Sequence, residues 1–162
     1  MKTMTVIEPQ TQYTIRFGDC DPFGHLNNAR YLDYIINARE DHLKQFYDLE
    51  LQSYYKKGTG WVITSHEIVY LRPAMFNEVV TVQSSLIDRG SGHLMVEGIM
   101  FDREGRVPKA VMWTSFAYIN LQTGKREIHP EDFMAFADEV LNTGIDFKRG
   151  LQERILELRN QI

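Results

Sequence analysis

The order of apolar and polar positions divides the chain into one long helix and a series of extended runs. Between 28 and 47, polar residues recur at steps of one, three and four, and bulky apolar residues occupy the opposite side. This period is typical of an amphipathic α-helix, and its broad apolar face predicts that the helix is wrapped by other elements. Before it, residues 11–17 alternate loosely and predict a short strand.

Extended runs follow the helix in close succession. The predicted strands cover 61–71, 78–88, 93–101 and 107–120, and residues 48–60 form a connection with a poorly defined helical turn. The links between the strands contain Gly, Pro, Asn or Asp, which favour turns. Because short links join consecutive strands, we expect antiparallel neighbours. The last run is long enough to predict a curved strand.

Two shorter helical segments follow the last strand. Pro130 can open a helix over 131–142, and a final helix begins near Asp146. The order of elements predicts an α+β fold, with one antiparallel sheet packed on one central helix. With no repeat or linker visible, residues 1–162 are interpreted as one domain, with a core over about 12–130 and a helical extension over 131–162.

Composition narrows the class of protein. A chain of 162 residues, 43% hydrophobic and 25% charged, fits one globular domain. Its net charge of −4 argues against a nucleic-acid partner. A single cysteine, Cys20, leaves no intrachain disulfide and favours a reducing compartment. With no signal peptide and no apolar run of about 20 residues, we expect a cytoplasmic protein without a membrane partner.

The densest group of candidate chemistry lies in the turn before the long helix. Residues 16–31 read Arg-Phe-Gly-Asp-Cys-Asp-Pro-Phe-Gly-His-Leu-Asn-Asn-Ala-Arg-Tyr. The Pro, the two Gly and the paired Asn indicate a sharp turn of the backbone. Polar groups on this turn lie at a helix N-terminus, where backbone N–H groups and the helix dipole favour negative charge. Such a turn can bind and polarise a ligand.

This turn and the order of elements resemble the hotdog-fold acyl-CoA thioesterases of the 4-hydroxybenzoyl-CoA thioesterase type. The resemblance lies in Gly-Asp-Cys-Asp-Pro at 18–22, Gly24, and Asn-Ala-Arg-Tyr at 28–31, with weaker signatures at 69–74, 78–80 and 124–130. It implies a hotdog fold and the hydrolysis of acyl-CoA or acyl carrier protein thioesters to free acid and thiol. It implies no cofactor other than the CoA of the substrate.

The turn is also similar to that of plant-type acyl-ACP thioesterases, in which Asp, His and paired Asn lead into the same helix. The matching positions are Asp21, His25, Asn27 and Asn28. In the 4-hydroxybenzoyl-CoA branch the position of His25 is apolar. The chain therefore combines features of two branches.

The resemblance implies that Asp21 is catalytic, either as a nucleophile or as a general base for water. From the residues alone, an Asx hydrogen bond within a turn is the alternative. Asp19 is interpreted as a structural acceptor, and in an extended segment both carboxylates would point to one side. His25 either orients the substrate or shuttles a proton, or is a loop or surface histidine. No metal-ligand spacing is visible, so we expect no metal site.

Other candidate residues surround this centre. The backbone N–H of Asn28 is the candidate donor to the thioester carbonyl, while Asn27 is a candidate cap that could also contact substrate. Tyr31 is a candidate pocket residue. His66 and Glu67 interrupt an apolar run, and polar groups in a buried strand need partners. They are predicted either to touch substrate or to pair across a subunit interface.

The resemblance further implies that the phosphates of CoA lie on the surface near basic and polar loop residues. The candidates are Arg89, Ser91, His93, Lys125 and Arg126, with solvated loop charges as the alternative. An open sheet edge predicts a homodimer with a continuous sheet, and homotetramers are common in the family. Two other functions stay open: an enoyl-thioester hydratase or dehydratase, and a non-catalytic acyl-CoA-binding module.

Overall fold

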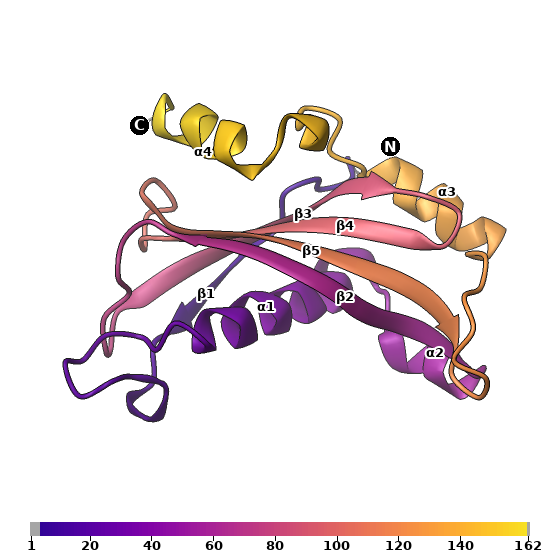
Figure 1. Ribbon diagram of the computed structural model, residues 1–162, viewed down its shortest axis with the longest axis horizontal. Coiled ribbons are helices and arrows are strands. Elements are labelled where there is room, and N and C mark those ends of the chain that lie inside the picture. The colour runs from indigo at the N-terminus through magenta and orange to yellow at the C-terminus, as the bar shows by residue number, and fades with distance from the viewer. Residues whose placement is uncertain (1–3, 162) are drawn as a thin grey trace.

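In the computed structural model, which describes residues 4–161, one antiparallel sheet packs on one long helix (Figure 1). The strands are β1 (Gln10–Thr14), β2 (Thr59–Tyr70), β3 (Val79–Arg89), β4 (His93–Phe101) and β5 (Pro108–Asn120). The helices are α1 (Arg30–Tyr47), α2 (Leu51–Lys56), α3 (Glu131–Val140) and α4 (Leu151–Arg159). The predicted α+β architecture is confirmed; the ends of the predicted 1–162 domain lie outside the described residues.

Three predicted boundaries are wrong in detail. The strand predicted over 11–17 ends at Thr14, because the chain turns into a short 3₁₀ helix at Phe17–Asp19. The predicted connection over 48–60 contains a full helix, α2. The final helix predicted from Asp146 opens with a 3₁₀ turn, Phe147–Arg149, before α4 begins.

The sheet has the strand order β1-β3-β4-β5-β2, and every neighbouring pair is antiparallel. The sheet curves around α1, which covers one face, while α4 lies on the other (Figure 1). Gly98 of β4 lets α1 approach closely, because a Cβ atom there would lie 2.2 Å from Cγ2 of Ile35. β2 forms an edge of the sheet, and every residue from Val62 to Glu67 is exposed.

A buried ion pair attaches α4 to the outer face of the sheet. Glu97 on β4 is 1% exposed, and its two carboxylate oxygens accept hydrogen bonds of 2.9 Å from Nε and an Nη of Arg154. The indole N–H of Trp113 donates to the same carboxylate at 2.9 Å. Around this pair, Leu151, Ile155 and Leu158 pack on the strands. The apolar residues bury this side of α4 against the sheet, and the two hydrogen bonds between Arg154 and Glu97 fix the orientation of the helix.

A second buried polar group lies between α1 and the sheet, on the side that sequence periodicity predicts to be apolar. His42 is fully buried, with Nδ1 2.7 Å from Oγ of Ser84 and Nε2 2.9 Å from Oγ1 of Thr11. An Nη of Arg39 donates to the same Ser84 oxygen at 3.0 Å. Burial, and then the charge of Arg39, lower the pKa of His42 to about 4. This histidine is therefore neutral at physiological pH.

Removing one partner of the buried ion pair should destabilise the fold. Glu97→Ala leaves the buried Arg154 charge with only the more distant carboxylate of Glu157, at 3.7 Å, so we expect the free energy of unfolding in urea to fall by about 3–5 kcal/mol. Glu153→Ala removes an exposed carboxylate that pairs with Arg149, and it should cost less than about 1 kcal/mol. A loss for Glu97→Ala as small as that of the control would contradict a stabilising role for this pair.

The buried histidine should make stability depend on pH. Because its folded-state pKa of about 4 lies below its ordinary 6.5, the unfolded chain binds an extra proton between these values. Stability is therefore lost as pH falls from 6.5 toward 4, by about 2–3 kcal/mol at pH 4.5. Urea unfolding at pH 7 and pH 4.5 should show a smaller loss for His42→Gln than for the wild type. Equal losses in the two proteins would contradict this assignment.

Candidate active site

The turn before α1 is closed by its own backbone. The N–H of Asp21 donates to the carbonyl of His25 at 2.8 Å, and the N–H of Gly24 donates back to the carbonyl of Asp21 at 3.0 Å. Gly24 has a φ of +79°, a conformation that a side chain would strain. The backbone conformation of the turn therefore explains why the motif has a glycine at position 24.

The Asp21 carboxylate has one oxygen engaged in this turn and one oxygen free. Its Oδ1 accepts hydrogen bonds from the backbone N–H groups of Phe23 at 2.9 Å and of His25 at 3.0 Å. The Asx-turn interpretation is thus correct for this oxygen. Oδ2 receives no hydrogen bond from any described residue. Since two backbone donors fix the carboxylate, its free oxygen has a defined direction.

Asp19 has the structural role predicted for it. Its Oδ2 accepts a 2.7 Å hydrogen bond from the hydroxyl of Tyr34, and its carbonyl accepts from the N–H of Asn27 at 2.9 Å. Burial and the bond to Asp19 raise the pKa of Tyr34 to about 12. The expectation that both carboxylates lie on one side of an extended segment is wrong, because Asp19 ends a 3₁₀ helix.

The N-terminus of α1 presents a free backbone donor. Asn27 forms a turn just before the helix: its Oδ1 accepts from the N–H of Ala29 at 3.1 Å, and its carbonyl accepts from the N–H of Arg30 at 2.8 Å. The N-cap of α1 is Ala29, without a side-chain cap, so the prediction of Asn27 as the cap is wrong. The N–H of Asn28 has no acceptor among residues 4–161. The carbonyl of Asn28 accepts a 2.7 Å hydrogen bond from the hydroxyl of Tyr70. Strand β2 thereby fixes the peptide that precedes the helix.

The predicted residues of this turn share one open hollow of about 480 Å³. It is lined by Asp21, His25, Asn27, Asn28 and Tyr31, with Leu26, Tyr70, Leu71, Arg72 and Pro73. Tyr31 is almost fully buried, and its hydroxyl accepts from the N–H of Ala74 at 2.9 Å. Tyr70 and Arg72 are not among the residues that the sequence analysis predicts for the site. Their place in the 69–74 signature was the signal available.

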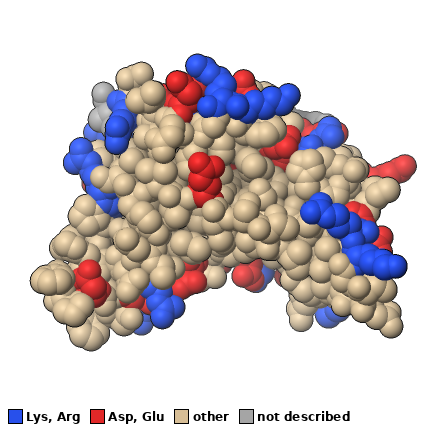
Figure 2. All heavy atoms as spheres, viewed as in Figure 1, with Lys and Arg blue, Asp and Glu red and all other residues tan. Residues whose placement is uncertain are grey.

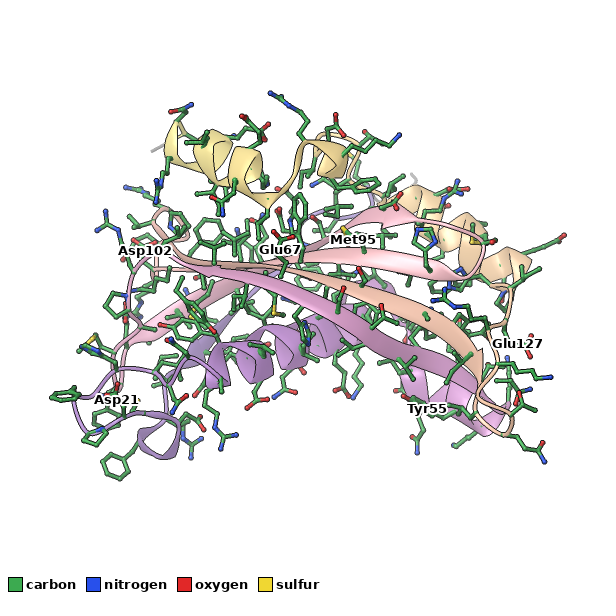
Figure 3. The ribbon with its side chains drawn as sticks, in the orientation of Figure 1. Asp21, Tyr55, Glu67, Met95, Asp102 and Glu127 are labelled. Atoms are coloured by element: carbon green, nitrogen blue, oxygen red, sulfur yellow. The ribbon has the colours of Figure 1, made fainter. Side chains whose placement is uncertain are left out.

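A second loop forms the other wall of the hollow. The N–H of Leu26 donates to the carbonyl of Ala74 at 2.8 Å, so the loop after β2 pairs with the Asp21 turn. Lys109 supports this loop from below, because its Nζ lies 2.7 Å from Oε1 of Glu78 and donates to the carbonyl of Pro73 at 3.0 Å. The two loops thus form one unit that opens on Asp21 (Figure 3).

His66 and Glu67 do not lie in this hollow. The middle of β2 is exposed in the single chain, so pairing of these two residues across a subunit interface stays a prediction. An apolar run in the sequence has the same pattern in an exposed edge strand as in a buried central strand, because the pattern does not show whether a second strand lies beside it. Neighbouring residues on a strand point to opposite faces. Nδ1 of His66 lies 2.9 Å from Oγ1 of Thr114, whereas Glu67 lies on the side of α4 (Figure 3).

The candidate CoA-binding residues lie at the opposite end of the sheet from Asp21. They lie at the turn from β3 to β4 or follow β5, near the labelled Glu127 in Figure 3, and Figure 2 shows both basic and acidic side chains at this end. Arg89 forms an ion pair with Asp138, and His93 lies 3.1 Å from Asp88. The remaining three candidates, Ser91, Lys125 and Arg126, are exposed. Within one chain none of these five residues lines the hollow at Asp21.

Two other kinds of chemistry find no support in the part of the chain that the structure describes. Residues 4–161 contain no group of three metal-binding side chains. Burial, followed by the charges of Asp19 and Asp21, raises the pKa of the Cys20 thiol. A raised pKa keeps this thiol protonated and makes it a poor nucleophile. None of the helices over the same residues is long and apolar enough to cross a membrane.

Comparison with known proteins gives consistent matches. A family model described as the thioesterase-like superfamily matches residues 15–137. The chain is 31% identical over 117 residues to the long-chain acyl-CoA thioesterase FadM of Escherichia coli, a match covering 72% of this chain and 86% of that protein. α4 lies beyond the part that the family model matches.

Solved structures share the fold. A probable thioesterase from Escherichia coli, YbaW, is 26% identical with a TM-score of 0.67, over 82% of this chain and 98% of that one. A 1,4-dihydroxy-2-naphthoyl-CoA thioesterase from Synechocystis has a TM-score of 0.73 at 16% identity, over 86% and 99%. A Staphylococcus aureus protein solved in complex with CoA has a TM-score of 0.75 at 16% identity, over 88% and 91%. At such low identity, the last two show the fold alone.

Proposed function

The chain belongs to the thioesterase-like superfamily and hydrolyses thioesters, and we propose that its substrates are acyl-CoA thioesters that react beside Asp21. One observation carries the assignment of the site. The free oxygen of the Asp21 carboxylate and the free N–H of Asn28 belong to residues that line the same hollow. A thioester carbonyl between them would meet a base or nucleophile and a hydrogen-bond donor.

The proposed reaction uses both groups. The N–H of Asn28 donates to the carbonyl oxygen as negative charge develops there, and one such donor is typically worth about 3 kcal/mol in the transition state. Asp21 Oδ2 either attacks the carbonyl carbon or takes a proton from the attacking water. In both versions the C–S bond breaks, CoA leaves as the thiol, and water supplies the second oxygen of the free acid.

His25 contributes to this site through its backbone. Its N–H holds Oδ1 of Asp21, while its ring is exposed and makes no hydrogen bond with a described residue. We therefore assign the ring a part in orienting the substrate and not in proton transfer. Arg72 supplies a positive side chain at the wall of the hollow, where it would attract the phosphates of CoA.

Pairing of two copies through β2 would complete the site. The Tyr70 end of β2 adjoins Asn28, and the Thr59 end adjoins Tyr118 on β5. Antiparallel pairing of this exposed edge with that of a second copy places one copy's Tyr70 end beside the other's Thr59 end. It would bring the predicted CoA-binding residues of one copy toward Asp21 of the other. These residues are Arg89, Ser91, His93, Lys125 and Arg126. This supports a homodimer with two equivalent sites; a homotetramer would pair two such dimers.

The carrier of the acyl group and the place of the reaction are further parts of the proposal. FadM is named for acyl-CoA, which favours CoA over acyl carrier protein as the leaving thiol. The single cysteine is in keeping with the cytoplasm.

A hydratase or dehydratase and a non-catalytic binding module fit the family match less well. A screen of acyl-CoAs of different length for thiol release, with crotonyl-CoA absorbance as a check for hydration, tests the acyl-CoA substrate and distinguishes hydrolysis from hydration and from binding alone.

Removing the carboxylate of Asp21 should abolish turnover without unfolding the protein. Asp21→Asn keeps an oxygen for the two backbone donors but loses the base, so we expect kcat to fall at least about 100-fold. Asp33→Asn, an exposed carboxylate paired with Arg30 on the first turn of α1, should keep kcat within about twofold. Thiol release from acyl-CoA measures both. Near wild-type turnover in Asp21→Asn would exclude the proposed site.

The His25 ring should matter much less than Asp21. Because the ring has no contact with the carboxylate, His25→Ala should lower kcat by less than about tenfold, below the 10²–10⁴ typical of an acid–base group. The same thiol-release assay across pH 5–8 would compare the two proteins. A loss as large as that of Asp21→Asn would give the ring a proton-transfer role, as in the plant-type branch.

A further inference from the structure

A second cavity lies toward the C-terminal end of α1, far from Asp21. It has a volume of about 140 Å³ and lies between α1, α2, α3 and the sheet. Its wall is mainly apolar, formed by residues such as Ile36, Leu43, Leu49, Trp61, Phe116 and Phe136. Tyr55, which also lines it, lies at the opposite end of the molecule from Asp21 in Figure 3. A dry cavity of about 150 Å³ is large enough to hold benzene.

One strongly basic side chain lines this apolar cavity. Arg39 is 9% exposed, so nine-tenths of the residue is removed from water. One Nη donates to Ser84 at 3.0 Å, and the guanidinium carbon lies 5.9 Å from the centre of the Tyr47 ring. No carboxylate among residues 4–161 lies within ion-pair distance of it. Burial lowers the pKa of Arg39, which reflects the cost of an uncompensated charge.

The neighbours of Arg39 do not supply the missing negative charge. Ser84 is neutral, and His42, which lies 2.7 Å from the same hydroxyl, is neutral at physiological pH. Glu40 also lines the cavity, but its side chain is 49% exposed and pairs with Lys44 at 3.1 Å. The Tyr47 hydroxyl, a second partner of Arg39, is neutral as well, and a buried cation with only neutral partners is costly to a fold. An anionic ligand would offset that cost.

We propose that this cavity binds a carboxylic acid with a compact apolar body, whose carboxylate pairs with Arg39. The guanidinium fork suits a carboxylate, and the apolar wall suits a body on the order of six to eight carbons. The carboxylate belongs either to a free acid or to the far end of a dicarboxylic acyl group. The binding itself does not depend on the thioesterase assignment.

A comparison of two ligands on the unmodified protein gives the first test. Octanoate and 1-octanol have the same chain, and only octanoate has a charge for Arg39. By titration calorimetry at pH 7.5, we expect octanoate to bind at least tenfold more tightly than 1-octanol. Equal affinities, tighter binding of the alcohol, or no binding of octanoate would overturn the proposal.

Variants then locate the carboxylate. Arg39→Met should weaken octanoate binding at least tenfold, and Arg39→Lys should recover part of it because the charge returns. Arg159→Met removes an exposed positive charge at the end of α4, and it should leave binding unchanged. Thermal unfolding verifies that each variant is folded; if Arg39→Met is not, the comparison of ligands decides. Octanoate binding that persists in folded Arg39→Met would overturn the proposal.

Turnover distinguishes the two sources of the carboxylate. If it is the far end of an acyl group, Arg39→Met should lower kcat/KM for octanedioyl-CoA at least tenfold relative to octanoyl-CoA. If it is a free acid, only octanoate binding should respond to Arg39. Asp21→Asn should lose turnover and retain octanoate binding, so a failure at either site is recognised separately.

Discussion

The contact between α1 and the sheet is the constraint on which the other features depend. Gly98 has no side chain, and Ile35 occupies the space that one would fill. This close approach fixes the depth at which α1 lies in the curve of the sheet. Because both ends of the helix are then set, the turn that contains Asp21 and the residues around Arg39 have fixed positions relative to the strands. A rigid helix thus places two chemically different environments within one small domain.

These two environments follow from the different ends of the same helix. At the N-terminus of α1 the hydrogen-bond donors are backbone N–H groups and not side chains, and an open hollow exposes them to solvent. Further along, the helix is covered by α2, α3 and the sheet, and the cavity between them is lined mainly by apolar residues together with Arg39 and Glu40. The first environment suits a polar reaction centre. The second suits an apolar group that carries a negative charge.

The sequence predicts the elements of this fold well, because periodicity reports which side of each element is buried. It also predicts which turn residues share one hollow, while the catalytic role of Asp21 comes from the family resemblance and stays a prediction. It does not reveal Arg39 or His42 as core residues, since helical periodicity treats every polar residue as exposed. The pairing of Glu97 with Arg154 joins positions 57 residues apart, and no local pattern reports such a contact. The exposure of β2 is not predicted either, because an apolar run does not show whether a strand lies at the edge of a sheet.

The attachment of α4 has a consequence for how larger assemblies can form. A flat apolar sheet face is a common surface for stacking one domain on another, but here Leu151, Ile155 and Leu158 already occupy it. Displacing these three residues would remove the apolar side chains that surround the Glu97–Arg154 ion pair. The extension beyond the family match therefore works as a built-in cap on one face. The face over α4 is thereby covered, whereas the edge of the sheet at β2 is left open for contacts in the plane of the sheet.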